Sequence, residues 1–121
     1  LTGLRREYIM NELDKIGITY HYFNMVSLKV MNELYNCLNL YLVSSRCEGG
    51  PRAVFEAGLT KTPIISTKVG ISPELVSRRS LFDAEDWTTY KNAKPRIDLL
   101  FNNVTKLSTR DYLEEFKDYI V

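Results

Sequence analysis

Two glutamates flank a glycine-containing segment near the middle of the sequence. Glu48 and Glu56 have seven residues between them, and the sequence Gly-Gly-Pro-Arg follows Glu48 directly. Carboxylates accept hydrogen bonds from hydroxyl groups, and glycines let a ligand approach the backbone closely. A helix that begins after the glycines presents free amides and a partial positive charge to an anion such as a diphosphate. These residues therefore predict a site for a polyhydroxyl ligand that carries a phosphate.

The same residues also allow a purely structural interpretation. A glutamate in the early turns of a helix is favoured by the helix dipole alone. Arg52 and Glu56 stand four positions apart, which is the spacing of a surface ion pair worth about 0.3 kcal/mol. The spacing of the charged residues leaves a ligand site and a surface ion pair both open.

The chain around the glutamates alternates between helical and extended patterns. Helices are predicted for residues 4–16, ended by Gly17, for residues 28–38, capped by Ser27, and for a segment that begins at Pro51. Strands are predicted for Ile18–Phe23, Leu40–Val43, Pro63–Thr67 and Leu81–Phe82, with a helical turn at residues 72–76. This alternation indicates βαβ crossovers and a parallel sheet, so the predicted fold class is α/β. In such a sheet ligands bind at the carboxyl ends of the strands, where the loop that contains Glu48 lies.

The two ends of the chain are less typical of a complete α/β domain. Residues 95–107 and 110–120 have helical spacing, whereas residues 83–95 show no readable pattern. The chain enters a helix directly after its first three residues, without the strand that normally precedes it. We therefore expect a piece of a longer protein, or a domain that lacks its first strands.

Composition and charge limit the classes of function. A length of 121 residues with 45% hydrophobic and 26% charged residues fits one globular domain. The net charge of +1 argues against nucleic acid as a partner, and no apolar run reaches the roughly 20 residues that cross a bilayer. Cys37 and Cys47 are too few for a disulfide scaffold, which favours a reducing, cytoplasmic location.

Other chemistry-bearing residues point to no second site. His21 is the only histidine and is interpreted as a packed or edge residue. Cys47 has no second cysteine at redox spacing, so nucleophilic catalysis is not expected. No cluster of His, Cys and carboxylates has the spacing of metal ligands, so no metal site is predicted. The scattered basic residues are interpreted as solvated surface: Lys29, Lys61, Lys68, Arg78 and Arg79.

One ordered set of motifs resembles a known family. The sequence VSSRCEGGPRAVFEAG, followed by PIISTKVGISPELV and preceded by LYNCLNLYLVSS, is similar to the C-terminal, donor-binding half of retaining glycosyltransferases of the GT-B fold. The resemblance is to the group 1 type, with its E-x7-E motif, and covers roughly residues 3 to 82. It implies a Rossmann-like three-layer sandwich with a parallel sheet. The implied domains are a donor-binding domain over residues 1–95 and C-terminal helices over residues 96–121, packed on the sheet or on an N-terminal domain.

The resemblance implies a role for each matching residue. Glu48 would be the catalytic residue that holds hydroxyls of the donor sugar, and the backbone at Gly49, Gly50 and Arg52 would lie against the sugar and the distal phosphate. Glu56 would accept hydrogen bonds from the ribose hydroxyls of the nucleotide. The donor would be a UDP- or GDP-sugar, with no metal and no further cofactor, and the anomeric configuration would be retained. The protein would act by positioning and charge stabilisation, so the glutamates are not read as a hydrolase acid–base pair.

Departures from the family pattern define further expectations. Gly50 stands where many members have an aromatic residue, Ile71 where a second glycine is common, and Lys61 where the helix usually ends in glycine. Lys61 is therefore expected to adopt a left-handed conformation at a cost of about 1 kcal/mol. The family's diphosphate-neutralising Arg and Lys, and its domain for an acceptor glycan, lipid or protein, would precede Leu1. This chain alone is thus expected to be inactive. The alternative is a catalytically inactive α/β nucleotide-sugar-binding or protein-interaction module.

Overall fold

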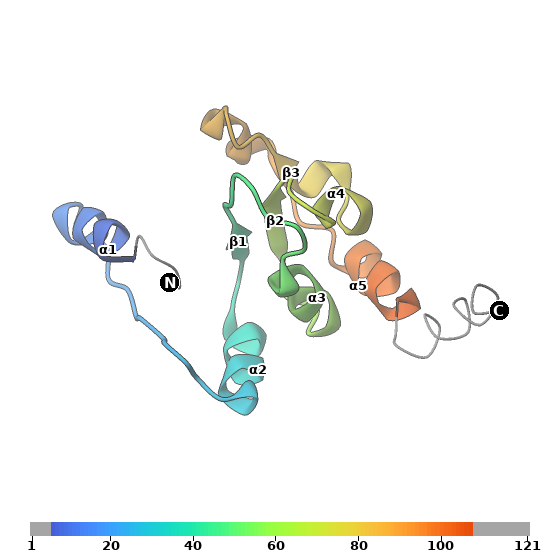
Figure 1. Ribbon diagram of the computed structural model, residues 1–121, viewed down its shortest axis with the longest axis horizontal. Helices are drawn as coiled ribbons and strands as arrows, with labels where there is room; N and C mark the ends of the chain where they lie inside the picture. Colours follow the sequence, from blue (N-terminus) through green and yellow to red (C-terminus); the bar gives the residue numbers. More distant parts are fainter. Residues whose placement is uncertain (1–5, 108–121) are drawn as a thin grey trace. The chain divides into compact units, whose positions relative to one another are not determined.

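The computed structural model of the chain describes residues 6–107 (Figure 1). The fold divides into two compact units, Leu1–Met31 and Asn32–Val121. The helix α1 (Arg6–Lys15) belongs to the first unit, and α2 (Leu28–Cys37) runs across the boundary between them. The predicted domain boundary at residue 95 stays a prediction.

The first unit contains a helix that is stabilised locally. Within the described residues α1 confirms the predicted helix, which ends where Gly17 adopts a φ of 70°. The Lys15 ammonium donates to the Glu12 carboxylate at 2.6 Å, and the backbone amide of Ile18 donates to the Leu13 carbonyl at 3.0 Å. No residue of α1 is buried, and Tyr8 is 65% exposed. The predicted helix has therefore formed although none of its residues is buried.

The predicted strand at Ile18–Phe23 is wrong. Between Arg6 and Leu107 the structure assigns strands only to later segments, and residues 18–23 carry no strand assignment. The β-branched and aromatic side chains of this segment favour an extended backbone. A strand, however, exists only through hydrogen bonds to a neighbouring strand. The residue propensities of this segment indicate an extended backbone, but they do not specify a second strand with which it could pair.

The helix α2 begins at its predicted cap. The backbone amide of Val30 donates to the Ser27 hydroxyl at 3.3 Å, as expected for a serine N-cap. Of the residues in α2, only Tyr35 is buried, whereas Leu28 is 81% exposed. The inward anchor of α2 is thus an aromatic side chain with a polar end.

The second unit contains a small parallel sheet (Figure 1). Its strands β1 (Tyr41–Val43), β2 (Ile64–Thr67) and β3 (Leu81–Phe82) lie in the order β1-β2-β3. Both pairings are parallel, with Tyr41 opposite Ile64 and Ser66 opposite Leu81. Parallel neighbours need a crossover, which α3 (Arg52–Leu59) supplies between β1 and β2. After β2 the chain passes through α4 (Ser72–Leu75) and the 3-10 helix η1 (Arg78–Ser80) to β3. The predicted α/β class with a parallel sheet is confirmed.

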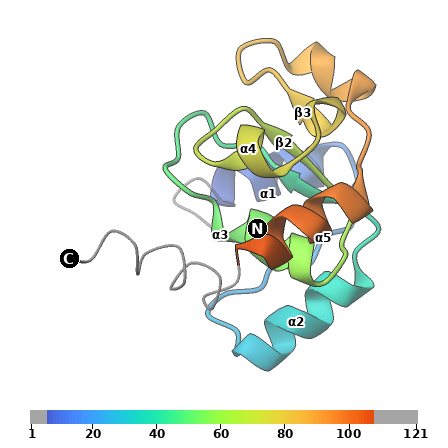
Figure 2. The ribbon, with the colours of Figure 1, turned by 90° about the vertical axis from the view of Figure 1, so that its right-hand side faces the viewer.

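Helices cover one face of this sheet. Figures 1 and 2 agree that α3, α4 and α5 (Ile97–Lys106) lie on the same side of the strands. All residues of the central strand β2 are buried. A Cβ added to Gly58 on α3 would come within 2.7 Å of the Val104 Cγ2 atom on α5, so these two helices pack almost backbone to side chain. The Asn103 amide also donates to the Leu75 carbonyl at 2.7 Å, which ties α5 to α4.

The end of α3 confirms the conformation predicted for Lys61. Its φ is 54°, in the left-handed region that favours glycine. The Lys61 Nζ lies 4.4 Å from the centroid of the Phe101 ring on α5. A cation over an aromatic face is worth about 0.5–1 kcal/mol at an exposed site. This contact offsets much of the backbone strain and adds a link between the end of α3 and α5.

The segment without a sequence pattern forms a second 3-10 helix, η2 (Trp87–Asn92). The side chain of Asp86 accepts from the Thr88 amide at 3.1 Å and so caps η2. The Trp87 ring packs on Phe82, with 5.7 Å between the ring centroids. The predicted helix at residues 95–107 is confirmed as α5, and the one at 110–120 lies outside the described residues. Among the helices described, none is long and apolar enough to span a bilayer.

Candidate functional site

The loop of residues 44–50 joins the carboxyl end of β1 to α3. Its beginning is fixed to the neighbouring strand, because the Thr67 hydroxyl at the end of β2 donates to the Ser45 carbonyl at 2.6 Å. Thr67 is fully buried. The loop therefore starts from the carboxyl ends of two adjacent parallel strands, which is where open α/β sheets bind ligands.

The middle of the loop contacts the turn that follows β2. Gly70 has a φ of 48°, and a Cβ added to it would collide with the Gly49 carbonyl and lie 2.6 Å from that of Glu48. Val69 beside it is 5% exposed and anchors the turn in the core. The loop that contains Glu48 and the turn that contains Gly70, some twenty residues apart in the sequence, thus form one backbone contact. We call the approach of Gly70 to the backbone of residues 48–49 the loop–turn contact.

The helix α3 begins one residue later than predicted. Pro51 is the N-cap, with φ −66° and ψ 107°, rather than the first helical residue. The proline ring sets φ near the helical value but leaves ψ free, so an extended ψ places Pro51 just outside the helix. No side chain caps this end of α3. The Val54 amide donates to the Pro51 carbonyl at 2.9 Å, whereas the amides of Arg52 and Ala53 have no partner among the described residues and can donate to an anion.

The loop and the first helical residue lie open to solvent. Glu48, Gly49, Gly50 and Arg52 are all exposed. A Cβ added to Gly49 or Gly50 would meet nothing within 4 Å, and neither glycine has a positive φ. Packing within the chain therefore does not require glycine at these two positions. This differs from Gly58 and Gly70, where neighbouring atoms leave no room for a side chain.

Glu56 lies in a different setting, against α2. Its Oε2 atom accepts a hydrogen bond from the Tyr35 hydroxyl at 2.9 Å, and its side chain is half-buried. The ring of Tyr35 packs on that of Tyr41, with 5.3 Å between centroids. Burial, with smaller contributions from Tyr41 and Glu56, raises the pKa of Tyr35 well above its usual value of 10.0. Tyr35 therefore remains a protonated donor to Glu56 across the physiological pH range.

The surface ion pair considered for Arg52 and Glu56 is not formed. Among residues 6–107 the salt bridge found joins Lys15 and Glu12. Arg52 extends from the exposed start of α3, whereas Glu56 takes its bond from Tyr35. The structural interpretation of Glu56 is consequently a link between α2 and α3, not a pair along one helix.

The structure thus divides the predicted site residues into two groups. Glu48, Gly49, Gly50 and Arg52 lie close together in the chain around the start of α3, and the first two belong to the loop–turn contact. Glu56 lies in the second turn of the same helix and contacts Tyr35. In the part of the chain that the structure describes, no hydrogen bond joins the two glutamates.

Sequence reasoning missed the residues that support the site. Tyr35 lies in the predicted helix over residues 28–38, and its hydroxyl is a donor that needs a partner when it is buried. That hydroxyl was the one signal available for the contact with Glu56. Nothing in the sequence indicated that the Thr67 hydroxyl reaches Ser45 or that Gly70 touches the loop.

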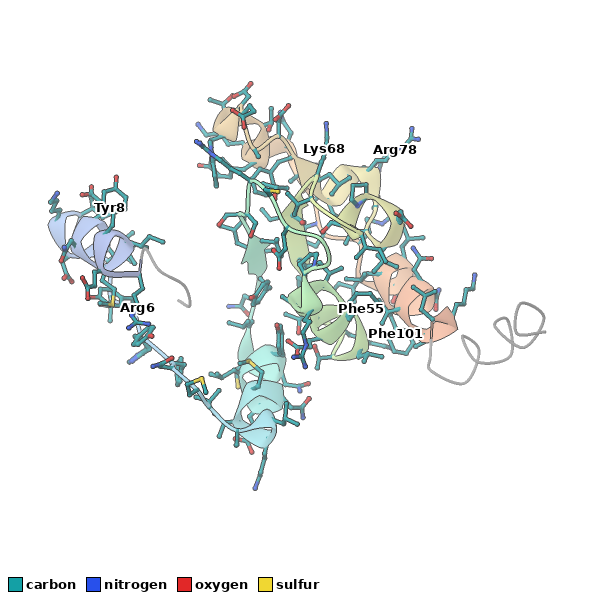
Figure 3. All side chains as sticks on the ribbon, viewed as in Figure 1. Arg6, Tyr8, Phe55, Lys68, Arg78 and Phe101 are labelled. Atoms are coloured by element: carbon teal, nitrogen blue, oxygen red, sulfur yellow. The ribbon has the colours of Figure 1, made fainter. Side chains whose placement is uncertain are left out.

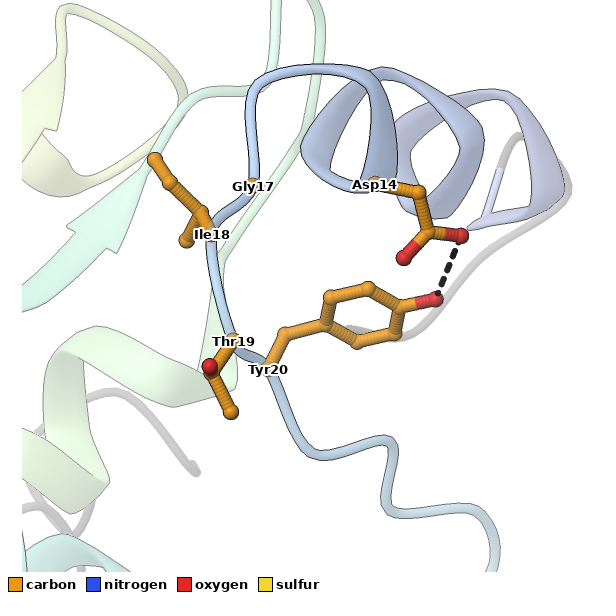
Figure 4. A pocket seen from close by; sticks show the side chains of 5 residues that line it. All are labelled: Asp14, Gly17, Ile18, Thr19 and Tyr20. Carbon is orange, nitrogen blue, oxygen red and sulfur yellow. Dashed lines mark hydrogen bonds between the residues drawn. The ribbon is translucent and has the colours of Figure 1, made fainter.

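A separate pocket, wide open to solvent, lies in the first unit (Figure 4). It measures about 420 Å³ and is lined by Asp14, Gly17, Ile18, Thr19 and Tyr20. The Tyr20 hydroxyl donates to the Asp14 carboxylate at 3.3 Å across one side of it. Desolvation, with a smaller effect of the Asp14 charge, raises the pKa of Tyr20. None of the predicted site residues lines this pocket.

The remaining candidate residues are on the surface. His21, Cys37 and Cys47 are exposed, and both cysteines are free thiols. The predicted surface lysines and arginines are exposed as well, and Figure 3 shows Lys68 and Arg78 extending outward. Among the described residues, no three side chains of His, Cys, Asp or Glu come together as metal ligands could.

No protein-family model matches the chain, and no curated protein matches it. The functional conclusion accordingly depends on the motifs and on the geometry of the loop–turn contact.

Proposed function

We propose that this chain is the donor-binding, C-terminal domain of a retaining glycosyltransferase of the GT-B fold, of the group 1 type. Its three parallel strands would be part of a Rossmann-like three-layer sandwich. The observation that carries the proposal is the loop–turn contact. Two motifs that the resemblance links only by order are in backbone contact at the carboxyl ends of β1 and β2.

The openness of the loop supports a ligand at this place. Gly49 and Gly50 have empty space where a side chain would be, and an uncapped helix begins two residues later. The N-terminus of a helix carries roughly half a positive charge, which stabilises a bound phosphate. The backbone at Gly49, Gly50 and Arg52 would therefore lie against the donor sugar and its distal phosphate.

The two glutamates would bind the two sugars of one donor. Glu48, exposed in the loop, would hold hydroxyls of the transferred sugar, and Glu56 would accept hydrogen bonds from the ribose. The position of Glu56 is compatible with this role, because α3 runs from the loop–turn contact to Glu56 in little more than one turn. The donor would be a UDP- or GDP-sugar, bound without a metal or a further cofactor.

In this proposal the chain contributes positioning and charge stabilisation. The α3 amides stabilise the diphosphate as the bond to the sugar breaks and negative charge accumulates on it. Glu48 holds the sugar so that the acceptor attacks from the face that retains configuration. The acceptor, a glycan, lipid or protein, would be bound through an N-terminal domain, and the enzyme would work in the cytoplasm.

A second candidate function has one observation in its favour. Glu56 already accepts a hydrogen bond from the Tyr35 hydroxyl, which is what a purely structural glutamate would do. In that case the chain is a catalytically inactive α/β module that binds a nucleotide sugar or another protein. A module that binds another protein would not depend on Glu56 for nucleotide affinity, whereas a module that binds a nucleotide sugar differs from the enzyme only in lacking transfer activity.

Calorimetric titration tests the proposal. The complete polypeptide that contains this chain is titrated with UDP, GDP and their sugar conjugates. We expect Glu56→Ala to weaken both bare and sugar-linked nucleotides about tenfold or more, as for the loss of charged hydrogen bonds. Glu48→Ala should weaken the sugar conjugate more than the bare nucleotide. Unchanged nucleotide affinity in Glu56→Ala would show that the ribose role is wrong and would favour the inactive module.

A further inference from the structure

We propose that Tyr35 is a positioning residue, which orients the Glu56 carboxylate toward the ribose of the donor. This inference rests on the proposed function, since it assumes that Glu56 binds the ribose. It adds a residue from α2, a helix that neither the E-x7-E motif nor the glycine loop includes. The contact that carries it is the 2.9 Å hydrogen bond from the Tyr35 hydroxyl to the Glu56 Oε2 atom.

Tyr35 is itself held at three points. Its ring packs on Tyr41, and its backbone carbonyl accepts from the Thr62 hydroxyl at 2.9 Å. Its hydroxyl donates to Glu56, and its side chain is only 4% exposed. A tyrosine with its ring, its backbone and its hydroxyl all engaged offers a donor in a fixed place.

This fixed donor sets the orientation of a carboxylate that would otherwise be free. The terminal torsion of a glutamate is broad, so its two oxygens have no preferred direction of their own. Oε2 bonds to Tyr35, and within residues 6–107 Oε1 has no hydrogen-bond partner. Each carboxylate oxygen can accept two hydrogen bonds, so both retain capacity for a vicinal diol. A diol thus meets a carboxylate that is already oriented.

Pre-organisation predicts a modest effect on affinity. Ordering one flexible side chain on binding weakens association by a factor of about three to ten. Because the ordered group faces only the ribose, that factor should appear in the preference for a ribonucleotide over its deoxy form. If Tyr35 had only a structural role, its substitution would instead lower the stability of the protein, or weaken the binding of the ribonucleotide and of its deoxy form equally.

The experiment compares ribose discrimination in four proteins. The complete polypeptide and its Tyr35→Phe, Glu56→Ala and Tyr90→Phe variants are titrated with UDP, GDP and their 2′-deoxy and 3′-deoxy forms. Tyr35→Phe keeps the ring on Tyr41 and leaves a half-exposed Glu56 that water can reach, so the fold is retained. Tyr90→Phe removes a hydroxyl from an exposed residue of η2 and serves as the matched control. Circular dichroism verifies that each variant is folded.

The outcomes separate this inference from the proposed function. We expect Glu56→Ala to abolish the preference for ribose, Tyr35→Phe to reduce it about three- to tenfold, and Tyr90→Phe to leave it unchanged. If Glu56→Ala discriminates like the wild type, or if the wild type binds no nucleotide, the ribose assignment fails and this inference fails with it. If Glu56→Ala loses discrimination and Tyr35→Phe keeps it, the proposed function stands and the positioning role is overturned.

Discussion

The loop of the candidate site and the residues beneath it differ in how tightly they are packed. Glu48, Gly49 and Gly50 are exposed, and a Cβ added to either glycine would meet nothing within 4 Å. Gly58 and Gly70, by contrast, lie where an added Cβ would meet other atoms at less than 3 Å. Packing therefore requires glycine at positions 58 and 70 but not at positions 49 and 50 of the loop.

This difference shows at which positions the packing of the chain requires glycine and at which it does not. The tight glycines allow α5 to lie on α3 and the turn after β2 to lie on the loop. The glycines that packing does not require, Gly49 and Gly50, either leave room for a ligand or have no function of this kind. Substitutions that compare the two kinds of glycine decide between these explanations.

The largest effect is expected at Gly70. Gly70→Ala combines a left-handed φ with a collision against backbone carbonyls, so it should lower the free energy of unfolding by about 2–4 kcal/mol. Urea unfolding measures the change. Gly17→Ala is the matched control, because Gly17 also has a positive φ but has nothing within 4 Å of an added Cβ. Equal losses in both variants would mean that the loop–turn contact adds nothing beyond backbone strain.

A smaller loss is expected at Gly58. A Cβ there would press on Val104 and Leu100, and overpacking costs about 1–3 kcal/mol, partly offset by the gain of about 1 kcal/mol in helix propensity. Gly58→Ala should therefore destabilise the protein by up to about 2 kcal/mol. The second arm is Val104→Ala, which should cost less in the Gly58→Ala background than in the wild type. Additive effects would contradict direct packing of α5 on α3.

Tyr35 extends the comparison to the contact between α2 and α3. Because its pKa is raised in the folded state, the unfolded chain loses the proton first, at about pH 10. The stabilisation that the protonated Tyr35 phenol gives to the folded state is therefore complete below pH 10. It is lost as the pH rises further, at up to about 1.4 kcal/mol per pH unit. Above pH 10 the free energy of unfolding should therefore fall more steeply with pH in the wild type than in Tyr35→Phe. Parallel curves for the two proteins would argue against a buried phenol at this position.

The elements of the second unit were predictable because their signals are local. Pro63–Thr67 starts at a proline and contains the β-branched residues Ile64, Ile65 and Thr67, and its last four residues form the buried strand β2. Leu100 and Val104 keep helical spacing, and both are buried on α5. In these segments the local pattern and the tertiary contacts favour the same structure.

The failures concern partners that the sequence does not specify. Ile18–Phe23 has the composition of a strand and carries no strand assignment, since strand formation depends on a second segment. The pair of Arg52 and Glu56 that their spacing allowed is not formed, and Glu56 accepts instead from Tyr35, twenty-one positions away, while its role toward a ligand stays a prediction. Long-range side-chain pairs of this kind have no periodicity by which they could be recognised.

The smallest effect on stability is expected at Gly50, and it is the most informative for function. A Cβ there meets nothing within 4 Å and φ is not positive, so Gly50→Ala should change the free energy of unfolding by no more than about 0.5 kcal/mol. Under the proposed function the same methyl group would stand between the backbone and the donor sugar. Calorimetry should then show weaker binding of the sugar conjugate, with the bare nucleotide much less affected.

Gly49→Ala provides a neighbouring comparison, because its Cβ is equally free of contacts. A variant that is as stable as the wild type but impaired in donor binding assigns the open space to a ligand. If both alanine variants bind the sugar conjugate like the wild type, the openness of the loop has no functional meaning, and the loop–turn contact is a structural feature of the sheet.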